Sequence, residues 1–346
     1  PVPAGEPTDR LVSFVDFAPT VLSLCGAAIP DHMQGVAFLG QATGRPREFV
    51  FGARDRVDEA FDLSRSVRDK RFLYIRNYMP HLSWMQPEGY SDASTFRREV
   101  ARLAAQGKLN AAQLTYAGPS KPLEELYDSE TDPHQIHNLA AAPAHRPTLH
   151  RMRRALRDWM LATRDAGFLT EPQMWDRLGP TGTPFQLARD RSRYPLSRLL
   201  EAADLVGRPN AVPKQAAFLR HSDGGVRYWA AEGLHAAGQA AGPAREALRA
   251  ALHDSEAVVR IEAAAALVGL GEDVQPLRTL EQELRSSRLD IALHAARALQ
   301  LLGDRARLVW PAMREVADRA RREEASVGDP AMFLRFSLDA ALGLSE

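Results

Sequence analysis

A block of small and aliphatic residues recurs in the second half of the sequence with a period of about 32 residues. Residues 226–234 read VRYWAAEGL, and residues 259–267 read VRIEAAAAL. Glycines recur with the same period, at intervals of 31, 33 and 32 residues: Gly207, Gly238, Gly271 and Gly303. This period, with two helices per repeat, is typical of a solenoid, in which a repeat buries its apolar face by stacking on its neighbour. The sequence therefore predicts an all-α array over residues 194–346.

The repeat pattern Asp-x-x-Val-Arg-x-x-Ala-Ala-x-x-Leu resembles short HEAT repeats of the bacterial type. Asp223 and Asp254 stand shortly before the two blocks, where a helix N-cap is expected. A third block, residues 290–299, has lost the Val-Arg pair. The resemblance implies a curved helical surface suited to a protein or polymer partner.

The first 170 residues are mixed in composition and predict an α+β unit. Runs of aromatic and branched residues predict three strands, at 48–52, 71–76 and 125–128. Apolar spacing predicts two helices, over 16–25 with Gly26 as its C-cap and over 147–166. The Pro- and Gly-rich stretch that follows predicts a surface linker, so the expected segments are 1–170, 171–193 and 194–346.

Charge and cysteine content exclude several classes of protein. The 44 basic and 44 acidic side chains cancel, which argues against a general nucleic-acid binder. A single cysteine, Cys25, excludes an internal disulfide and a cysteine-rich zinc site. The sequence contains no run of eighteen apolar residues, so it predicts no membrane-spanning helix.

Two local patterns invite a chemical interpretation. His134 and His137, three residues apart, could share a helix face and bind zinc, although Asp132 and Pro133 more simply predict the capped start of a helix. Cys25 lies between Leu24 and Gly26 at an apolar helix end and is expected to be a small core residue.

A cluster of alternating charges follows the first predicted strand. Arg54, Asp55, Asp58 and Glu59 stand where an active-site rim is expected, since arginine can bind an anionic ligand through two hydrogen bonds. A solvated loop of compensating charges is the alternative interpretation of the same residues.

Three stretches together resemble the C-terminal part of a sulfatase, in the branch of heparan N-sulfatase-like and arylsulfatase A-like enzymes. Residues 8–22 contain the Asp-x-x-Pro-Thr helix, and residues 51–56 with 66–78 resemble the pair of strands that ends in Arg-x-x-Lys-Tyr-Ile-x-Asn. Residues 125–139 match Glu-Leu-Tyr-Asp-x-x-x-Asp-Pro-x-Glu-x-x-Asn-Leu, with Gln135 in place of the usual glutamate. The third match favours a structural role for His134 and His137.

The resemblance implies an alkaline-phosphatase-like enzyme that uses a formylglycine and a calcium ion. No Cys/Ser-x-Pro/Ala-x-Arg motif for the formylglycine occurs here, and Cys25 is followed by Gly-Ala-Ala-Ile. The family's calcium ligands precede the Asp-x-x-Pro-Thr helix, so we expect a truncated start with no catalytic or metal residues in this chain. We also expect exposed apolar residues where the missing sheet would pack: Phe14, Phe17, Val21 and Leu22.

The expected fold is thus the α+β C-terminal subdomain of an α/β sulfatase, a small antiparallel sheet plus a helix, followed by an all-α HEAT-like solenoid. The resemblance implies part of a sulfuric ester hydrolase acting on sulfated glycans or aryl sulfates, in the periplasm or outside the cell. Arg54, Asp55, Asp58 and Glu59 would then contact substrate. The alternative is a non-enzymatic binding module whose helical repeats hold a partner.

Overall fold

The computed structural model describes residue 5, residues 7–179 and residues 182–344. Residues 1–4, on which the expected truncated start partly rests, lie outside these ranges. The chain forms two compact units. The first comprises Pro1–Arg54, Ser64–Arg76 and Glu124–Met160, and the second comprises Asp55–Leu63, Asn77–Leu123 and Leu161–Glu346. The chain therefore passes repeatedly between the units, whereas the sequence predicted three consecutive segments.

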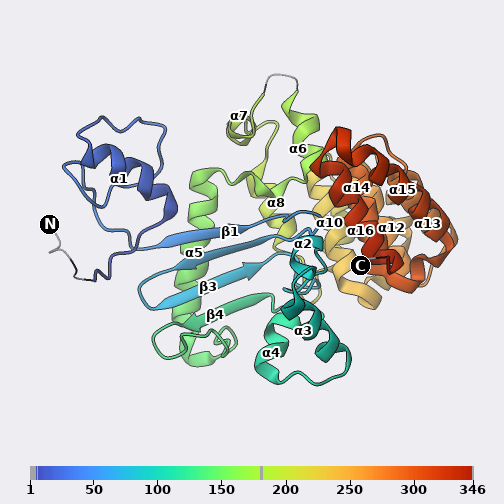
Figure 1. Cartoon of the computed structure of the whole chain (residues 1–346), viewed down its shortest axis with the longest axis horizontal. Helices are drawn as coiled ribbons and strands as arrows, with labels where there is room; N and C mark the ends of the chain where they lie inside the picture. The colour runs from blue at the N-terminus through green and yellow to red at the C-terminus, as the bar shows by residue number, and fades with distance from the viewer. Residues whose placement is uncertain (1–4, 6, 180–181, 345–346) are drawn as a thin grey trace. The chain divides into compact units, whose positions relative to one another are not determined.

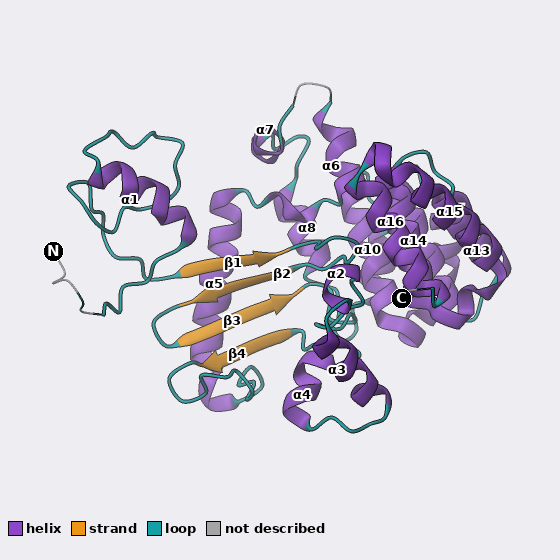
Figure 2. Ribbon diagram, in the orientation of Figure 1, coloured by secondary structure: helices purple, strands orange, loops and turns teal. Residues whose placement is uncertain are grey.

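A four-stranded sheet organises the first unit (Figure 2). Its strands lie in the order β1 (Val50–Arg54), β2 (Ser64–Arg68), β3 (Phe72–Asn77), β4 (Glu124–Asp128). The pairs β1–β2 and β3–β4 are antiparallel, with Gly52 opposite Ser66 and Tyr74 opposite Leu126. The three predicted strands are confirmed, whereas β2 reads Ser-Arg-Ser-Val-Arg and has no apolar run that would predict it.

Helix α5 (Arg146–Thr163) confirms the predicted amphipathic helix (Figure 1). The residues that it buries are spaced by three and four: Leu149, Met152, Leu156 and Met160. The Trp159 ring stacks on Phe51 of β1, with centroids 4.7 Å apart and planes 3° apart. This stripe joins the helix to the sheet, since each fully buried side chain contributes about 1.5–3 kcal/mol.

The N-terminal segment contains a 3₁₀ turn, η1 (Phe14–Asp16), and helix α1 (Phe17–Leu24). The predicted ending at Gly26 is confirmed: its φ is +69°, and the amides of Gly26 and Ala27 donate to the carbonyls of Ser23 and Leu22 at 3.3 and 2.9 Å. This bond pattern requires a left-handed residue, which glycine adopts without a steric penalty. Cys25 is exposed, so the expectation of a core residue was wrong; the last turn of α1 faces solvent at this position.

Helices also occupy the two stretches for which the sequence predicted least. Between β3 and β4 lie α2 (Gly89–Asp92), α3 (Thr95–Ala105) and α4 (Ala111–Ala117). Just before the predicted linker lies η3 (Ala166–Phe168), and within the linker lie α6 (Glu171–Leu178) and α7 (Pro184–Arg189). Leu178 and Leu187 of this stretch are buried. Residues 180 and 181 of this stretch lie outside the described residues.

The rest of the second unit is helical (Figure 1). Its elements are α8 (Leu196–Ala203), α9 (Val212–Phe218), α10 (Gly224–Ala237), η4 (Gly238–Ala244), α11 (Arg245–Ala251), α12 (Ala257–Gly269), α13 (Val274–Leu284), α14 (Leu289–Leu302), η5 (Gly303–Val309), α15 (Trp310–Val327) and α16 (Asp329–Leu342). Helices α10, α12, α14 and α16 pack on one another in chain order, and α9, α11, α13 and α15 each pack on one of them. Alanines such as Ala264 and Ala295, both fully buried, allow this close approach. No helix among the described residues has the length and apolarity to cross a membrane.

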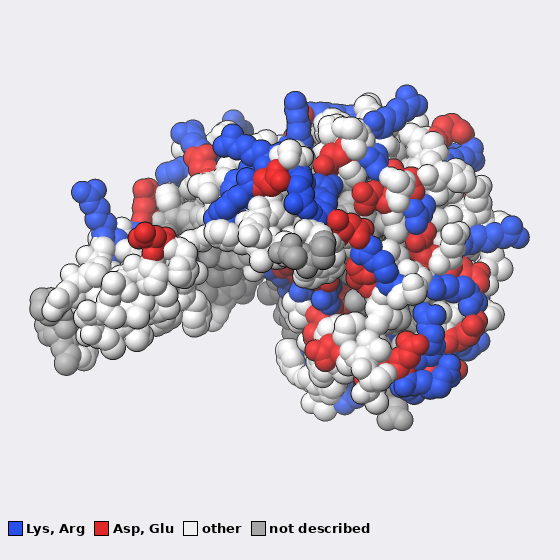
Figure 3. Space-filling view, turned by 90° about the horizontal axis from the view of Figure 1, so that it is seen from above, with Lys and Arg blue, Asp and Glu red and all other residues white. Residues whose placement is uncertain are grey.

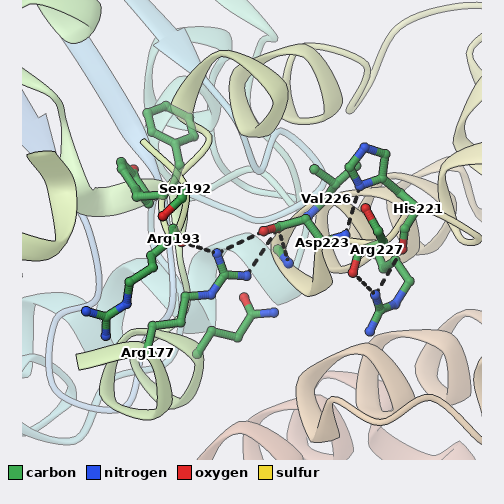
Figure 4. Close-up of polar contacts among 12 residues, drawn as sticks. Arg177, Ser192, Arg193, His221, Asp223, Val226 and Arg227 are labelled. Carbon is green, nitrogen blue, oxygen red and sulfur yellow. Dashed lines mark hydrogen bonds and ion pairs between the residues drawn. The ribbon is translucent and has the colours of Figure 1, made fainter. Parts of the chain in front are cut away.

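The residues of the repeat pattern hold the ends of these helices (Figure 4). Asp223 is confirmed as the N-cap of α10, where it accepts from the amides of Gly225 and Val226 at 2.9 and 3.2 Å. Arg177 also binds the Asp223 carboxylate, at 3.0 Å. The expectation that Asp254 is the N-cap of α12 was wrong, because Glu256 takes that position. Asp254 lies two residues before the N-cap and pairs with Arg227 at 2.6 Å. The aspartate and arginine of the pattern thus join one repeat to the next.

Each of the four periodic glycines has a positive φ, between 53° and 90°. We expect Gly271→Ala to lower the free energy of unfolding by about 1–2 kcal/mol, because an L-residue is strained at its φ of +90°. Gly269→Ala is the matched control. Gly269 is the last residue of α12, with no atom within 4 Å of an added Cβ, so alanine should be neutral or stabilising by up to about 1 kcal/mol. Urea unfolding of both variants tests this, and equal effects would contradict it.

Candidate functional site

The charged loop after β1 forms a tight turn in the second unit. The backbones of Val57 and Ala60 bond to each other in both directions, at 3.0 and 2.8 Å. Asp58 sits in this turn with a φ of +50°. The side chain of Glu59 is buried, and its Oε1 accepts from the Gly89 amide at 2.6 Å. The turn therefore fixes two of the predicted site carboxylates against the start of α2.

Asp58 and Glu88 form a carboxyl–carboxylate pair beside that helix. Burial, and then the hydrogen bond and negative charge of Glu88, raise the pKa of Asp58. Burial alone would raise the pKa of Glu88, but hydrogen bonds from Ser91 and from the Tyr90 amide lower it below its usual range. A neutral Asp58 can thus donate to an ionised Glu88, a pairing of acid and base typical of functional sites but also of structural networks.

A cavity of about 260 Å³ lies beside the same loop in the second unit. Its lining combines charged and aromatic side chains: Asp55, Arg56, Phe61, Glu171, Tyr228 and Trp229. The Nε of Arg56 donates to Glu171 at 2.9 Å, and its guanidinium also donates to the Asp58 carbonyl. Carboxylates that accept from hydroxyls, together with a cation and aromatic walls, provide the polar and apolar contacts that a small polar ligand requires.

The predicted site residues do not all fall in one unit. Asp55, Asp58 and Glu59 belong to the second unit, whereas Arg54 is the last residue of β1 in the first. Asp55 is exposed, Arg54 and Asp58 are half-buried, and Glu59 is buried. The structure therefore gathers three of the four around the turn and α2.

Arg297 is a residue of this region that the sequence analysis missed. It is 2 % exposed, and its guanidinium donates to Oε1 of Gln86 and to the Pro87 carbonyl, at 2.8 and 2.9 Å. Burial lowers its pKa to about 10, while the negative charge of Glu59 raises it. The available signal was an arginine inside the alanine-rich block 290–299, directly after Ala295 and Ala296.

The second unit also buries a cluster of three histidines and two glutamates, defined here as the His-Glu cluster: His81, Glu232, His235, Glu262 and His294. The Glu262 carboxylate binds Nδ1 of His235 and Nε2 of His294, each at 2.8 Å. Burial would raise the pKa of Glu262, but these two imidazoles lower it. Burial and the neighbouring His235 lower the pKa of His81 to about 3. Burial and the negative charge of Glu262 raise the pKa of Glu232. The sequence signal was a Glu-x-x-His step on α10.

The other predicted ligands do not assemble into a site. His134 and His137 are exposed, and no helix begins there: Asp132 instead caps a turn by accepting from the amides of Ile136 and His137. Among the described residues, one group of three His, Cys, Asp or Glu side chains has ligand atoms close enough for a metal, and it contains two imidazoles. Calcium prefers six to eight oxygen ligands, so this group does not fit the calcium of the resemblance.

Surface charge agrees with the neutral composition. Acidic and basic side chains are intermingled on the face drawn in Figure 3, and the segment around α1 presents mostly uncharged side chains there. Some exposed arginines are paired, such as Arg321 with Asp318 at 2.9 Å.

Comparison with curated proteins relates about half of the chain to sulfatases. An ulvan-active sulfatase of Formosa agariphila is 42% identical over 169 residues, which are 49% of this chain and 28% of that protein. A second ulvan-active sulfatase of the same organism is 30% identical, over 46% of this chain and 31% of its own length. Human N-sulphoglucosamine sulphohydrolase is 24% identical, over 46% of this chain and 34% of its own length. The chain thus spans about a third of these relatives, and no protein-family model matches it.

Solved structures give weaker likenesses. One is a complex with the substrate D-glucosamine-2-N,6-O-disulfate, with a TM-score of 0.27 and 15% identity over 42% of this chain and 23% of its own. Another is an engineered protein, with a TM-score of 0.31 and 18% identity over 60% of this chain and 94% of its own. Scores this low establish no shared fold.

Proposed function

We propose that this chain is the C-terminal part of a sulfatase that hydrolyses sulfuric esters of a sulfated glycan. The observation that carries the proposal is the 42% identity to an ulvan-active sulfatase over 169 residues. The names of the relatives favour a glycan over an aryl sulfate, since one acts on ulvan and another on N-sulphoglucosamine. Under this proposal the enzyme is exported to the periplasm or beyond, as the resemblance implies.

Exposed apolar residues around α1 support the proposal that a further part of the catalytic domain packs there. Phe14, Phe17 and Val21 are 89%, 48% and 57% exposed, and Leu22 is half-buried. Contiguous exposed apolar surface on a protein marks an interaction site. The formylglycine and calcium would belong to that further part, because the residues described here do not fit either group.

The charged loop would recognise substrate. Asp55 and Asp58 would accept from sugar hydroxyls and Arg54 would bind a sulfate oxygen. Glu59 is proposed as a positioning residue, since its carboxylate already holds the Gly89 amide. The helices of the second unit would form the HEAT-like array, which the positive φ of its periodic glycines supports.

We expect Arg54→Ala, in the protein made from the complete reading frame, to raise KM for sulfate release from ulvan oligosaccharides by roughly 10- to 100-fold. Loss of a charge-assisted hydrogen bond costs about 1.5–3 kcal/mol, which gives a change of that size. The value of kcat should change less, since Arg54 would bind the ground state and the transition state alike.

Arg191→Ala, at an exposed arginine outside the cavity, is the matched control and should leave KM unchanged. Release of sulfate from ulvan oligosaccharides or N-sulfated glucosamine, measured by ion chromatography, tests the function itself. Absence of release from every sulfated glycan by the complete protein would overturn the proposal. Turnover by the 346-residue chain alone would overturn the assignment of the catalytic groups to another part.

A further inference from the structure

The His-Glu cluster brings together ligands that neither the sulfatase relatives nor the resemblance accounts for. His81 comes from the loop after β3, and Glu232 and His235 project from α10 three residues apart. One ligand atom from each lies within 4.8 Å of the other two. Side chains three residues apart on a helix share a face, which explains why α10 can supply two of the three.

Buried polar atoms point to a ligand in this cluster. The Oε1 of Glu232 and the Nδ1 of His81 are both buried without a hydrogen-bond partner. The Glu232 side chain is only 4% exposed, and its Oε1 lies 3.5 Å from Nε2 of His81. Buried polar atoms in proteins are nearly always satisfied, so an acceptor oxygen beside imidazoles calls for a bound species.

Glu262 fixes the orientation of the His235 imidazole. Glu262 binds Nδ1 of His235 at 2.8 Å, which leaves Nε2 of that imidazole with its lone pair. Metal-bound histidines almost always donate their other ring N–H to a carboxylate, a backbone carbonyl or a water. The other carboxylate oxygen of Glu262, Oε1, hydrogen-bonds Nε2 of His294 at 2.8 Å.

We propose that His81, Glu232 and His235 bind one divalent transition-metal ion of the zinc class. Two imidazoles and one carboxylate suit zinc, and three protein ligands leave a fourth position open. Ligands of a tetrahedral zinc stand about 3.5 Å apart, so side-chain shifts of roughly 1 Å close the set around an ion. The three side chains line a cavity of about 30 Å³, together with Tyr228 and Arg297, and this volume can hold a bound water.

Zinc titration of the untagged, chelator-treated 346-residue chain tests the site. Calorimetry should show one equivalent bound, and mass spectrometry of the dialysed protein should find one zinc per chain. Cobalt should give the visible absorption of a low-symmetry four-coordinate site, and millimolar calcium should not compete. Because no readout depends on sulfate release, failure of the sulfatase proposal would leave this result intact.

Glu232→Gln keeps the size of the side chain and removes its charge, and should abolish the bound equivalent. Glu262→Gln should weaken binding by about 10- to 100-fold, as loss of an outer-shell partner does. His253→Asn, at an exposed histidine outside the cluster, should bind zinc as the parent does. Circular dichroism confirms that each variant is folded. No zinc bound to the parent, or an unchanged equivalent in folded Glu232→Gln, would overturn the proposal.

Discussion

Lys121→Met should lower the free energy of unfolding by about 3–5 kcal/mol, as measured by urea unfolding. Lys121 and Asp62 are both fully buried, and the Lys121 ammonium donates to the two carboxylate oxygens at 2.8 and 2.9 Å. It also donates to the Leu82 carbonyl at 3.3 Å and lies 5.1 Å from the centre of the Trp84 ring. Removal of Lys121 leaves the Asp62 charge buried without its ion-pair partner, which is the costly case.

A second substitution separates lost charge from lost packing. Lys121→Met combined with Asp62→Asn removes both charges. The side-chain oxygen of the new asparagine can still accept from the backbone N–H of Leu63, so the double variant should regain most of the stability that Lys121→Met loses. Lys214→Met removes a half-exposed ion pair with Glu201 and should cost less than about 1 kcal/mol. If Lys121→Met cost no more than Lys214→Met, the buried pair would not have the role assigned to it.

Trp229→Ala should destabilise the second unit by about 3–5 kcal/mol. Trp229 is 2% exposed and lies within 5.3–6.3 Å, centroid to centroid, of the rings of Tyr78, Phe168 and Tyr228. Its indole Nε1 donates to the Phe168 carbonyl at 2.9 Å. Truncation therefore leaves a large cavity and a buried carbonyl without its donor.

Trp229→Phe separates these two contributions, because it keeps most of the ring and loses only the donor. It should cost about 1–3 kcal/mol. Trp175→Ala, at a half-exposed tryptophan, should cost less than about 1 kcal/mol. Thermal unfolding followed by near-UV circular dichroism gives all three values. Equal losses at Trp229 and Trp175 would contradict the assignment of Trp229 to the core.

Local patterns predicted the elements whose own residues are apolar. β1, β3 and β4 each contain a run of aromatic or branched residues, and α5 has its stripe at spacings of three and four. The sequence did not predict β2, because one of the residues that this strand buries is an arginine. Arg65 is 1% exposed, and its guanidinium donates to the Ser64 carbonyl at 2.9 Å. A buried arginine looks like a surface residue until its partners are known.

The candidate sites depend on contacts across long stretches of chain, which a single sequence does not display. The charged loop was visible as Arg54–Glu59, but nothing local pairs Asp58 with Glu88, thirty residues away. The Glu-x-x-His step of α10 was likewise visible, whereas His81, Glu262 and His294 come from three other elements. Residue type and spacing predicted the charged loop but not the His-Glu cluster, whose members tertiary packing brings together.

The path of the chain determines which truncations keep the second unit whole. Residues 55–63 and 77–123 belong to the same unit as the helices that follow residue 161. A cut at residue 193 would therefore remove only part of that unit and leave behind Lys121, Asp62 and His81. The helices after residue 161 share one compact unit with two segments that precede them in the chain, so the helices expressed alone would not reproduce that unit.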